Sequence, residues 1–352
     1  MLILEFNNKD KEIIKTIGDS FTIALEFELE TEDTSNPDES ISPAKFFEIV
    51  KENTTRYIND KYKGEKDKMF ALVDEIINSL DFGDDEDNIE ILNEYLDEYN
   101  KGFENKLIQI IISDYMDHII SDNIEYLTDK LKENLPIFFR KWDSQLKYEL
   151  DNTLNRGIEF SMKTYLDSID KTIELIEDFY SEFNKQDYWQ MNKRTGIHIN
   201  IGLHHKVDWN ILKGVLMISD VGEESFTFKN MEWRDKSFYT KSIIPYLKSE
   251  IESDKTKIMK HSNFYDLKNL EDHFEKFILS IIKKQGYKNF GFNITRIKDH
   301  NYVEFRYPGG EITKQTLIDK VYYFCYITYL MTDKSFKRKE YLKKLYKFIS
   351  TI

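Results

Sequence analysis

Glutamates that alternate with apolar residues are the first chemical signal in this sequence. In residues 21–30, FTIALEFELE, the odd-numbered residues from Phe21 to Leu29 are apolar, and Glu26 and Glu28 fall between them. A period of two predicts a half-buried β-strand with one apolar and one polar face. Glutamate is depleted in strands. Two carboxylates on one strand face are therefore candidates for chemistry.

Three further segments repeat this pattern. Strand-like residues 156–162 carry Glu159, residues 195–205 carry His198, and residues 302–307 carry Glu304 and Arg306. Taken singly, such a glutamate is typical of a solvated surface position. Such a histidine is typical of a core side chain whose hydrogen bonds are satisfied. Taken together, they predict one sheet whose polar face gathers four carboxylates, an imidazole and a guanidinium.

Carboxylates that face one another in a cleft repel and have raised pKa values unless cations neutralise them. The gathering therefore predicts a metal site. Oxygen ligands with one imidazole suit Mg²⁺ or Mn²⁺ better than Zn²⁺ or copper. Because Mg²⁺ is usually held by carboxylates together with substrate phosphates, a nucleotide is the expected ligand. Arg306, two residues from Glu304 on the same face, is placed to pair with its phosphates.

The rest of the chain predicts an α+β protein. Helical periodicity with high acidity runs from about residue 42 to 135 and indicates three to five helices. A helix is expected after residue 162 through about Tyr180, residues 289–297 and 302–307 form an expected hairpin, and two helices close the chain. We predict a curved, mainly antiparallel sheet with helices on one face. Residues 1–40 and 136–352 are expected to form the domain that carries the polar residues described above, and residues 41–135 are expected to form an inserted acidic helical region.

Composition narrows the class of protein. The 352 residues carry a formal charge of −14, which disfavours nucleic-acid and membrane-surface partners. Cys325 is the single cysteine and is expected to be a buried thiol. The N-terminus lacks a signal-peptide pattern and no apolar run reaches membrane-spanning length, so the expected location is the cytoplasm of a cell or infected host. The bias toward Lys, Ile, Asn and Glu indicates an AT-rich bacterial or phage genome.

The order of these motifs resembles a known family. FTIALEFELE, WDSQL, RGIEFSM, GIHINIG and NITRIKDHNYVEFR are similar to the amidoligase family of the glutamine synthetase and glutamate-cysteine ligase superfamily. The similarity covers about residues 20–30 and 140–310. It implies a sheet of the glutamine synthetase-like type. It also implies an ATP-dependent carboxylate-amine ligase, in which an acid attacks the γ-phosphate and an amine then displaces phosphate from the acyl phosphate.

The resemblance also implies individual roles. Glu26 and Glu28 would bind separate ions, Glu159 would share the Glu28 ion, and His198 and Glu304 would complete the ion at the ATP phosphates. The implied catalytic residues are Arg306, Glu304 and Arg234, although Arg234 is equally compatible with surface pairing. The implied nucleotide contacts are His198, Asn200 and Arg306, and the implied substrate contacts are Ser144 and Asn293.

Two departures from the family pattern leave questions open. Asn200 stands where many relatives have a second histidine, and the acidic region 41–135 lengthens the chain between Glu28 and Asp143. That region is a lid, a partner-binding surface, a scaffold or plain structural elaboration. The expected partners are carboxylate and amine substrates, whether amino acid, peptide or protein, and the oligomeric state is open. A phosphotransferase on the same fold and a non-catalytic binding or assembly protein are the alternative functions.

Overall fold

The chain divides into two compact units. The computed structural model describes residues 6–31, 43–64, 66–80, 85–150, 157–218, 226–231 and 290–350, with residue 154 and isolated positions between 234 and 283. Residues 1–32 and 134–352 form the first unit, here called the sheet unit, and residues 33–133 form the second, here called the helical unit. The sequence places the corresponding boundaries at residues 41 and 135.

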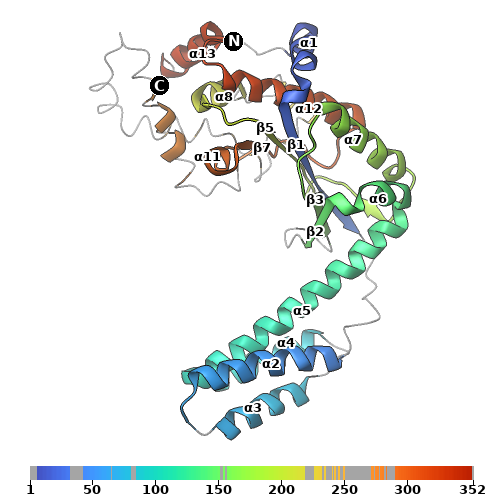
Figure 1. The fold of residues 1–352 in the computed structure, drawn as a ribbon, viewed down its shortest axis with the longest axis vertical. Coiled ribbons are helices and arrows are strands. Elements are labelled where there is room, and N and C mark those ends of the chain that lie inside the picture. Colours follow the sequence, from blue (N-terminus) through green and yellow to red (C-terminus); the bar gives the residue numbers. More distant parts are fainter. Residues whose placement is uncertain are drawn as a thin grey trace. The chain divides into compact units, whose positions relative to one another are not determined.

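A seven-stranded antiparallel sheet organises the sheet unit (Figure 1). Its order is β2-β3-β1-β5-β7-β6, and β4 pairs with β1 beside this path. The predicted α+β class and antiparallel sheet are confirmed. The strands are β1 (Phe21–Thr31), β2 (Leu146–Leu150), β3 (Gly157–Met162), β4 (Trp189–Gln190), β5 (Ile197–Leu203), β6 (Phe292–Asn293) and β7 (Tyr302–Phe305).

Helices pack against one face of this sheet. Among them, α7 contacts β1, and α12 contacts β5 and also α1, α7 and α8. The described helices of this unit are α1 (Asn8–Thr16), α6 (Pro136–Trp142), α7 (Ile169–Phe183), α8 (Ile211–Ile218), α11 (Ile297–His300), α12 (Lys314–Thr332) and α13 (Arg338–Ser350), with short 3-10 turns η1 (Gly18–Ser20) and η2 (Asp143–Gln145).

Aromatic side chains fill the layer between sheet and helices. Phe27 of β1 stacks on Phe160 of β3 with ring centroids 5.1 Å apart, and Phe179 of α7 covers Phe27 at 4.5 Å. On the same face but in the other half of the sheet, Phe305 of β7 stacks on Phe324 of α12, with ring centroids 4.3 Å apart. Burial of these rings follows from the period of two in the strands, because alternate residues share one face. The core therefore occupies the apolar face of the sheet.

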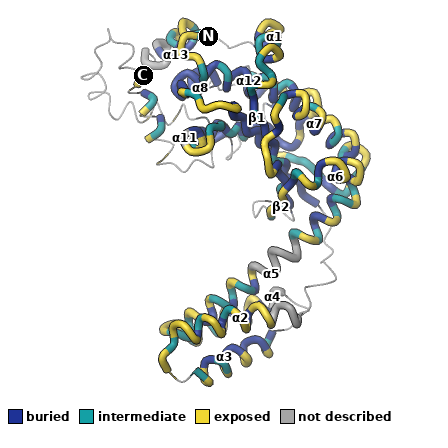
Figure 2. Tube along the Cα trace, viewed as in Figure 1, coloured by how far each residue is buried: buried dark blue, intermediate teal, exposed yellow. Residues whose placement is uncertain are grey.

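The helical unit has a core of its own. It contains α2 (Pro43–Lys61), α3 (Lys66–Ser79), α4 (Asp85–Glu98) and α5 (Gly102–Asn134), the last ending at the start of the sheet unit. Four helices among the described residues agree with the expected number. Their apolar residues recur at helical spacing, which gives each helix a buried face and an exposed face (Figure 2). The core includes Val50, Ile58, Leu72, Ile76, Leu92, Leu107, Ile108 and Ile111.

Two expectations require correction. The hairpin expected over residues 289–307 has a first strand of only two described residues, and helix α11 occupies its connection. Asn301, in the left-handed conformation at φ 58°, ends α11 and turns the chain into β7. Strand β1 was expected to be half-buried, but its polar face is also largely buried, because Glu28 and Glu30 on that face are 7% and 3% exposed.

Two predictions about apolar segments can be compared with the structure. Cys325 is buried, as expected. Within the part of the chain that is described, no helix has the length and apolarity needed to cross a bilayer.

Candidate metal centre

Strand register brings the predicted site residues onto one face of the sheet. Glu26 of β1 lies opposite Ser161 of β3 and His198 of β5. Glu28 lies opposite Glu159. These are cross-strand neighbours, whose side chains project in the same direction about 5 Å apart. Positions far apart in the sequence therefore meet at one place, here called the polar face.

His198 lies at the centre of the polar face. Its Nδ1 is 2.9 Å from Glu26 Oε2 and 3.8 Å from Glu304 Oε1, and its Nε2 is 3.3 Å from Glu28 Oε1. The imidazole side chain is 4% exposed. Both ring nitrogens thus face carboxylate oxygens in a nearly dry environment.

Amide and guanidinium groups hold the other carboxylates. Asn200 Nδ2 donates to Glu26 Oε1 at 2.6 Å. On the neighbouring strands, Asn293 Nδ2 donates to Glu304 Oε2 at 2.7 Å, and Arg306 Nη1 donates to Glu304 Oε1 at 2.6 Å. Each hydrogen bond fixes the direction in which a carboxylate oxygen points. The predicted nucleotide and substrate contacts Asn200 and Asn293 therefore serve as supports for carboxylates in this structure.

Glu159 differs from these supported carboxylates. No described residue donates a hydrogen bond to its carboxylate, although one oxygen of Glu159, one of Glu26 and one nitrogen of His198 lie within 4.8 Å of one another. Burial, and next the charge of Glu26, raise the pKa of Glu159 to about 7. Here the structure reproduces the repulsion expected of gathered carboxylates.

The pKa values of Glu26 and His198 shift in a complementary way. Burial alone would raise the pKa of Glu26, but the hydrogen bond and charge of His198, helped by Asn200 and Arg306, lower it to about 2. Burial alone would lower the pKa of His198, yet Glu28 and Glu26 together raise it. Glu26 and His198 therefore each stabilise the charged form of the other.

Arg234 is the buried cation at the end of the polar face. It is 2% exposed, and burial lowers its pKa to about 10 despite the opposing charge of Glu28. Gly196 separates these groups. A methyl group added there would lie 3.0 Å from Glu28 Oε2, 3.1 Å from Arg234 Nη2 and 3.3 Å from His198 Nε2. The glycine is thus required by close packing, and Arg234 lies beside the predicted cluster.

Ser144 is the predicted site residue that the structure does not bring into the cluster. It lies in η2, and its carbonyl oxygen accepts a hydrogen bond from Lys163 Nζ at 3.4 Å. Among the described residues it contacts none of the clustered carboxylates. The grouping of ligands also differs from the one implied by the resemblance, since Glu159 converges with Glu26 and His198.

Strand β2 also contributes to the polar face, which was not predicted from the sequence. Lys147 lies opposite Ser161, and Glu149 lies opposite Glu159, so both extend the polar face to the sheet edge. They form an ion pair of 2.9 Å with side chains 49% and 59% exposed. The alternation in LKYEL indicated this strand, but a segment of five residues next to a helix is too short to distinguish the strand period of two from the helical period of 3.6.

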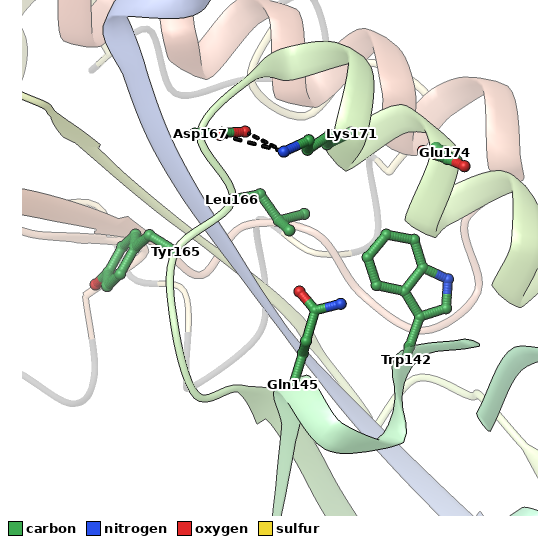
Figure 3. A pocket seen from close by; sticks show the side chains of 7 residues that line it. All are labelled: Trp142, Gln145, Tyr165, Leu166, Asp167, Lys171 and Glu174. Atoms are coloured by element: carbon green, nitrogen blue, oxygen red, sulfur yellow. Dashed lines mark hydrogen bonds and ion pairs between the residues drawn. The ribbon is translucent and has the colours of Figure 1, made fainter. Parts of the chain in front are cut away.

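A small cavity lies at the start of α7. It has a volume of about 270 Å³ and is lined by residues of α6, η2, α7 and the segment after β3. Figure 3 shows the ion pair between Asp167 and Lys171, with a distance of 2.9 Å, at one side of it. The ring of Tyr165 points away from Trp142 and Gln145 in the same view.

The geometry can bind a divalent cation. Two carboxylates and an imidazole converge, and the buried Asn200 Oδ1 has no hydrogen-bond partner among the described residues. Oxygen and nitrogen donors of this kind suit Mg²⁺ or Mn²⁺. Comparisons with models of protein families, with curated proteins and with solved structures find no match to this chain.

Proposed function

We propose that this chain is a divalent-cation-dependent enzyme that uses ATP, in the cytoplasm, to join a carboxylate to an amine. The observation that carries the proposal is the convergence of Glu26, Glu159 and His198 within 4.8 Å. Glu159 has a raised pKa, and an ion between these groups would relieve the repulsion that raises it. The donor set thus fits Mg²⁺ or Mn²⁺, and a divalent ion would supply charge stabilisation for bound phosphates.

The residues around this group have supporting roles in the proposal. Asn200 orients Glu26, and Asn293 and Arg306 orient Glu304 through hydrogen bonds of 2.6 to 2.7 Å. Outer contacts of this kind orient metal ligands and tune their basicity. Arg306 and Arg234 add positive charge beside the carboxylates, where an anionic phosphoryl group would need it.

The ligase reaction itself rests on the resemblance of the sequence motifs to amidoligases. A sheet of the glutamine synthetase-like type, with its polar face as the catalytic surface, is part of the same proposal. A free carboxylate is a poor acyl donor, so phosphorylation by ATP would create an acyl phosphate with a good leaving group. Attack by an amine would then release phosphate and form an amide or isopeptide bond. The guanidinium groups of Arg306 and Arg234, which flank the carboxylates, would favour the first step, in which the phosphoryl group is transferred.

The test measures ADP and phosphate release by the full-length protein with Mg²⁺ and ATP. Panels of carboxylic acids and amines are supplied separately and together. A ligase releases both products only when acid and amine are present together. Phosphate appearing on a hydroxyl or guanidino acceptor would instead identify a phosphotransferase. If Mg²⁺ and ATP neither stabilise the protein thermally nor react, the proposal fails in favour of a binding or assembly protein.

The structure offers a matched pair of variants for this test. Glu159 and Glu149 are cross-strand neighbours on the same face, but only Glu159 belongs to the convergent group. Glu159→Gln is expected to reduce turnover by about 100-fold, a typical loss when the surroundings of a metal are disturbed. Glu149→Gln, on the exposed sheet edge, is expected to leave turnover within twofold of the native value. Equal turnover in both variants would contradict the assignment of Glu159.

A further inference from the structure

Two tyrosines, of which Tyr165 is exposed and Tyr302 is partly buried, lie on the polar face beyond the carboxylates. Tyr302 of β7 precedes Glu304 by two residues and pairs with Gly202 of β5, so its side chain shares the face of Glu304. Tyr165 follows β3 in a segment that pairs with β1 through Leu166 and Ile23. The two rings are 5.4 Å apart at an interplanar angle of 49°, and Tyr165 is 38% exposed. Together they form an aromatic surface, here called the tyrosine pair.

The sheet beneath the tyrosine pair is built from small residues. A methyl group added at Gly202 would lie 2.7 Å from Thr22 Oγ1 and 3.2 Å from Tyr302 Cβ. The next row toward the carboxylates contains Ala24 opposite Asn200. Gly202, Ala24 and Asn200 are themselves buried, and Asn200 lies opposite Glu304. A ligand that reached from the tyrosines to the carboxylates would therefore lie over the partly exposed side chains of Glu304 and Glu26, which are 12% and 23% exposed.

The spacing along the strand limits what such a ligand can be. The row of Thr22 and Gly202 is four residues from Glu26, which corresponds to about 13 Å at the usual rise of a strand. This is the scale that separates the base of an extended nucleoside triphosphate from its terminal phosphate. The polar face thus presents aromatic rings at one end and clustered carboxylates with a histidine at the other.

The tyrosines present uncharged rings at neutral pH, because an ordinary tyrosine loses its proton only near about pH 10. His300 adds a third ring 6.1 Å from Tyr302. Neutral aromatic rings bind planar bases by stacking and do not depend on a particular hydrogen-bond pattern.

We propose that Tyr165 and Tyr302 form the platform on which the nucleobase stacks when the phosphates of a nucleoside triphosphate reach the carboxylates and His198. This inference rests on the proposed function, because it assigns the base end of the same nucleotide. The tyrosines act as positioning residues and take no part in bond making. Loss of the platform should weaken the binding of ligands that contain a base and leave the binding of ligands that contain only phosphates unchanged.

The experiment compares two ligands by isothermal titration calorimetry with Mg²⁺ and the full-length protein. The first is a non-hydrolysable ATP analogue and the second is inorganic tripolyphosphate. Tyr302→Ala and Tyr165→Ala are each expected to weaken binding of the analogue by about tenfold, within the range of one base-aromatic stack. Tripolyphosphate binding is expected to stay within twofold of the native value.

Two controls separate stacking from general damage. Tyr302→Phe keeps the ring and is expected to retain native affinity for the analogue. Ile137→Ala removes a side chain on α6 that is 63% exposed, and it is expected to change neither ligand's affinity. Thermal unfolding of each variant reports whether the fold is intact.

The outcomes distinguish the two levels of inference. If the native protein binds the analogue and the alanine variants bind it equally well, the platform is wrong while the proposed function stands. Equal weakening of analogue and tripolyphosphate would also overturn the platform, because the loss would then lie at the phosphate end. If the native protein binds no analogue at millimolar Mg²⁺, both the platform and the proposed function are overturned.

Discussion

The two units carry acidic residues in opposite ways. Residues 33–133 contain 26 of the 64 acidic residues and 11 of the 50 basic residues, a formal charge of −15. The remainder of the chain is then +1, which together gives the −14 of the whole sequence. In the helical unit, described acidic residues such as Glu90 and Glu94 are exposed. In the sheet unit, near neutrality overall, Glu26, Glu28, Glu159 and Glu304 converge on one face.

This difference shows why local density of charge is a poor guide to a site. An exposed carboxylate stays hydrated, so its ionisation costs little and needs no specific partner. A carboxylate in the buried part of the polar face loses water and must gain hydrogen bonds, a cation or a proton instead. Glu26 gains His198 and Asn200, whereas Glu159 has a pKa raised to about 7. Buried acidic residues are therefore informative even where the surrounding unit is nearly neutral.

The largest expected effect is that of Glu26→Ala. Removing this carboxylate deletes a candidate ligand and leaves His198 without its 2.9 Å partner. We expect Mn²⁺ binding to weaken by at least about 100-fold, the upper end of losses for residues that only support a metal. Electron paramagnetic resonance titration of Mn²⁺ measures the change. Glu94→Ala in the helical unit is the matched control. An equal loss of Mn²⁺ affinity in both variants would contradict the difference between the two units.

The second expected effect is a pH dependence that belongs to the sheet unit. Because the pKa of Glu159 is raised from 4.5 to about 7, the folded protein holds this proton more tightly than the unfolded chain does. In the metal-free protein its contribution to stability is fully present below about pH 4.5 and is lost as the pH rises through about 7.

Metal binding should show the opposite trend, because a cation competes with the proton on Glu159. From pH 6 to pH 8 the affinity for Mn²⁺ is expected to rise about tenfold, as the carboxylate changes from mostly protonated to mostly ionised. Calorimetric titration at the two pH values measures the change, and Glu159→Gln should flatten it. An equally steep rise in that variant would assign the titration to another group.

The smallest expected effect concerns the helical unit. Glu90 and Glu94 are exposed and four residues apart on α4, where like charges repel across one helical turn. Glu90→Gln is therefore expected to stabilise the protein by at most about 0.5 kcal/mol and to leave Mn²⁺ affinity unchanged. Chemical denaturation provides the free energy of unfolding. Destabilisation by more than this amount would mean that the surface charge of α4 has a structural partner.

Several candidate site residues could be predicted from the sequence because a strand has a fixed period. Alternation alone assigns Glu26 and Glu28 to one face of β1 and Glu304 and Arg306 to one face of β7. It does not state which strands are neighbours or in which register they pair. Lys147, Tyr165 and Tyr302 were missed for the same reason, since their place on the polar face depends on pairing with distant segments.

The sequence by itself determined the α+β class, the main strands, the helical nature of the inserted region with three to five helices, and the residue types of the polar face. These follow from local periodicity, because side-chain direction repeats every two residues in a strand and about every 3.6 in a helix. Only the tertiary structure decided that Glu26 lies opposite His198, that Glu28 lies opposite Glu159, and that Ser144 lies apart from them. Register and burial are properties of contacts between distant segments, and it is burial that converts ordinary carboxylates into a candidate metal centre.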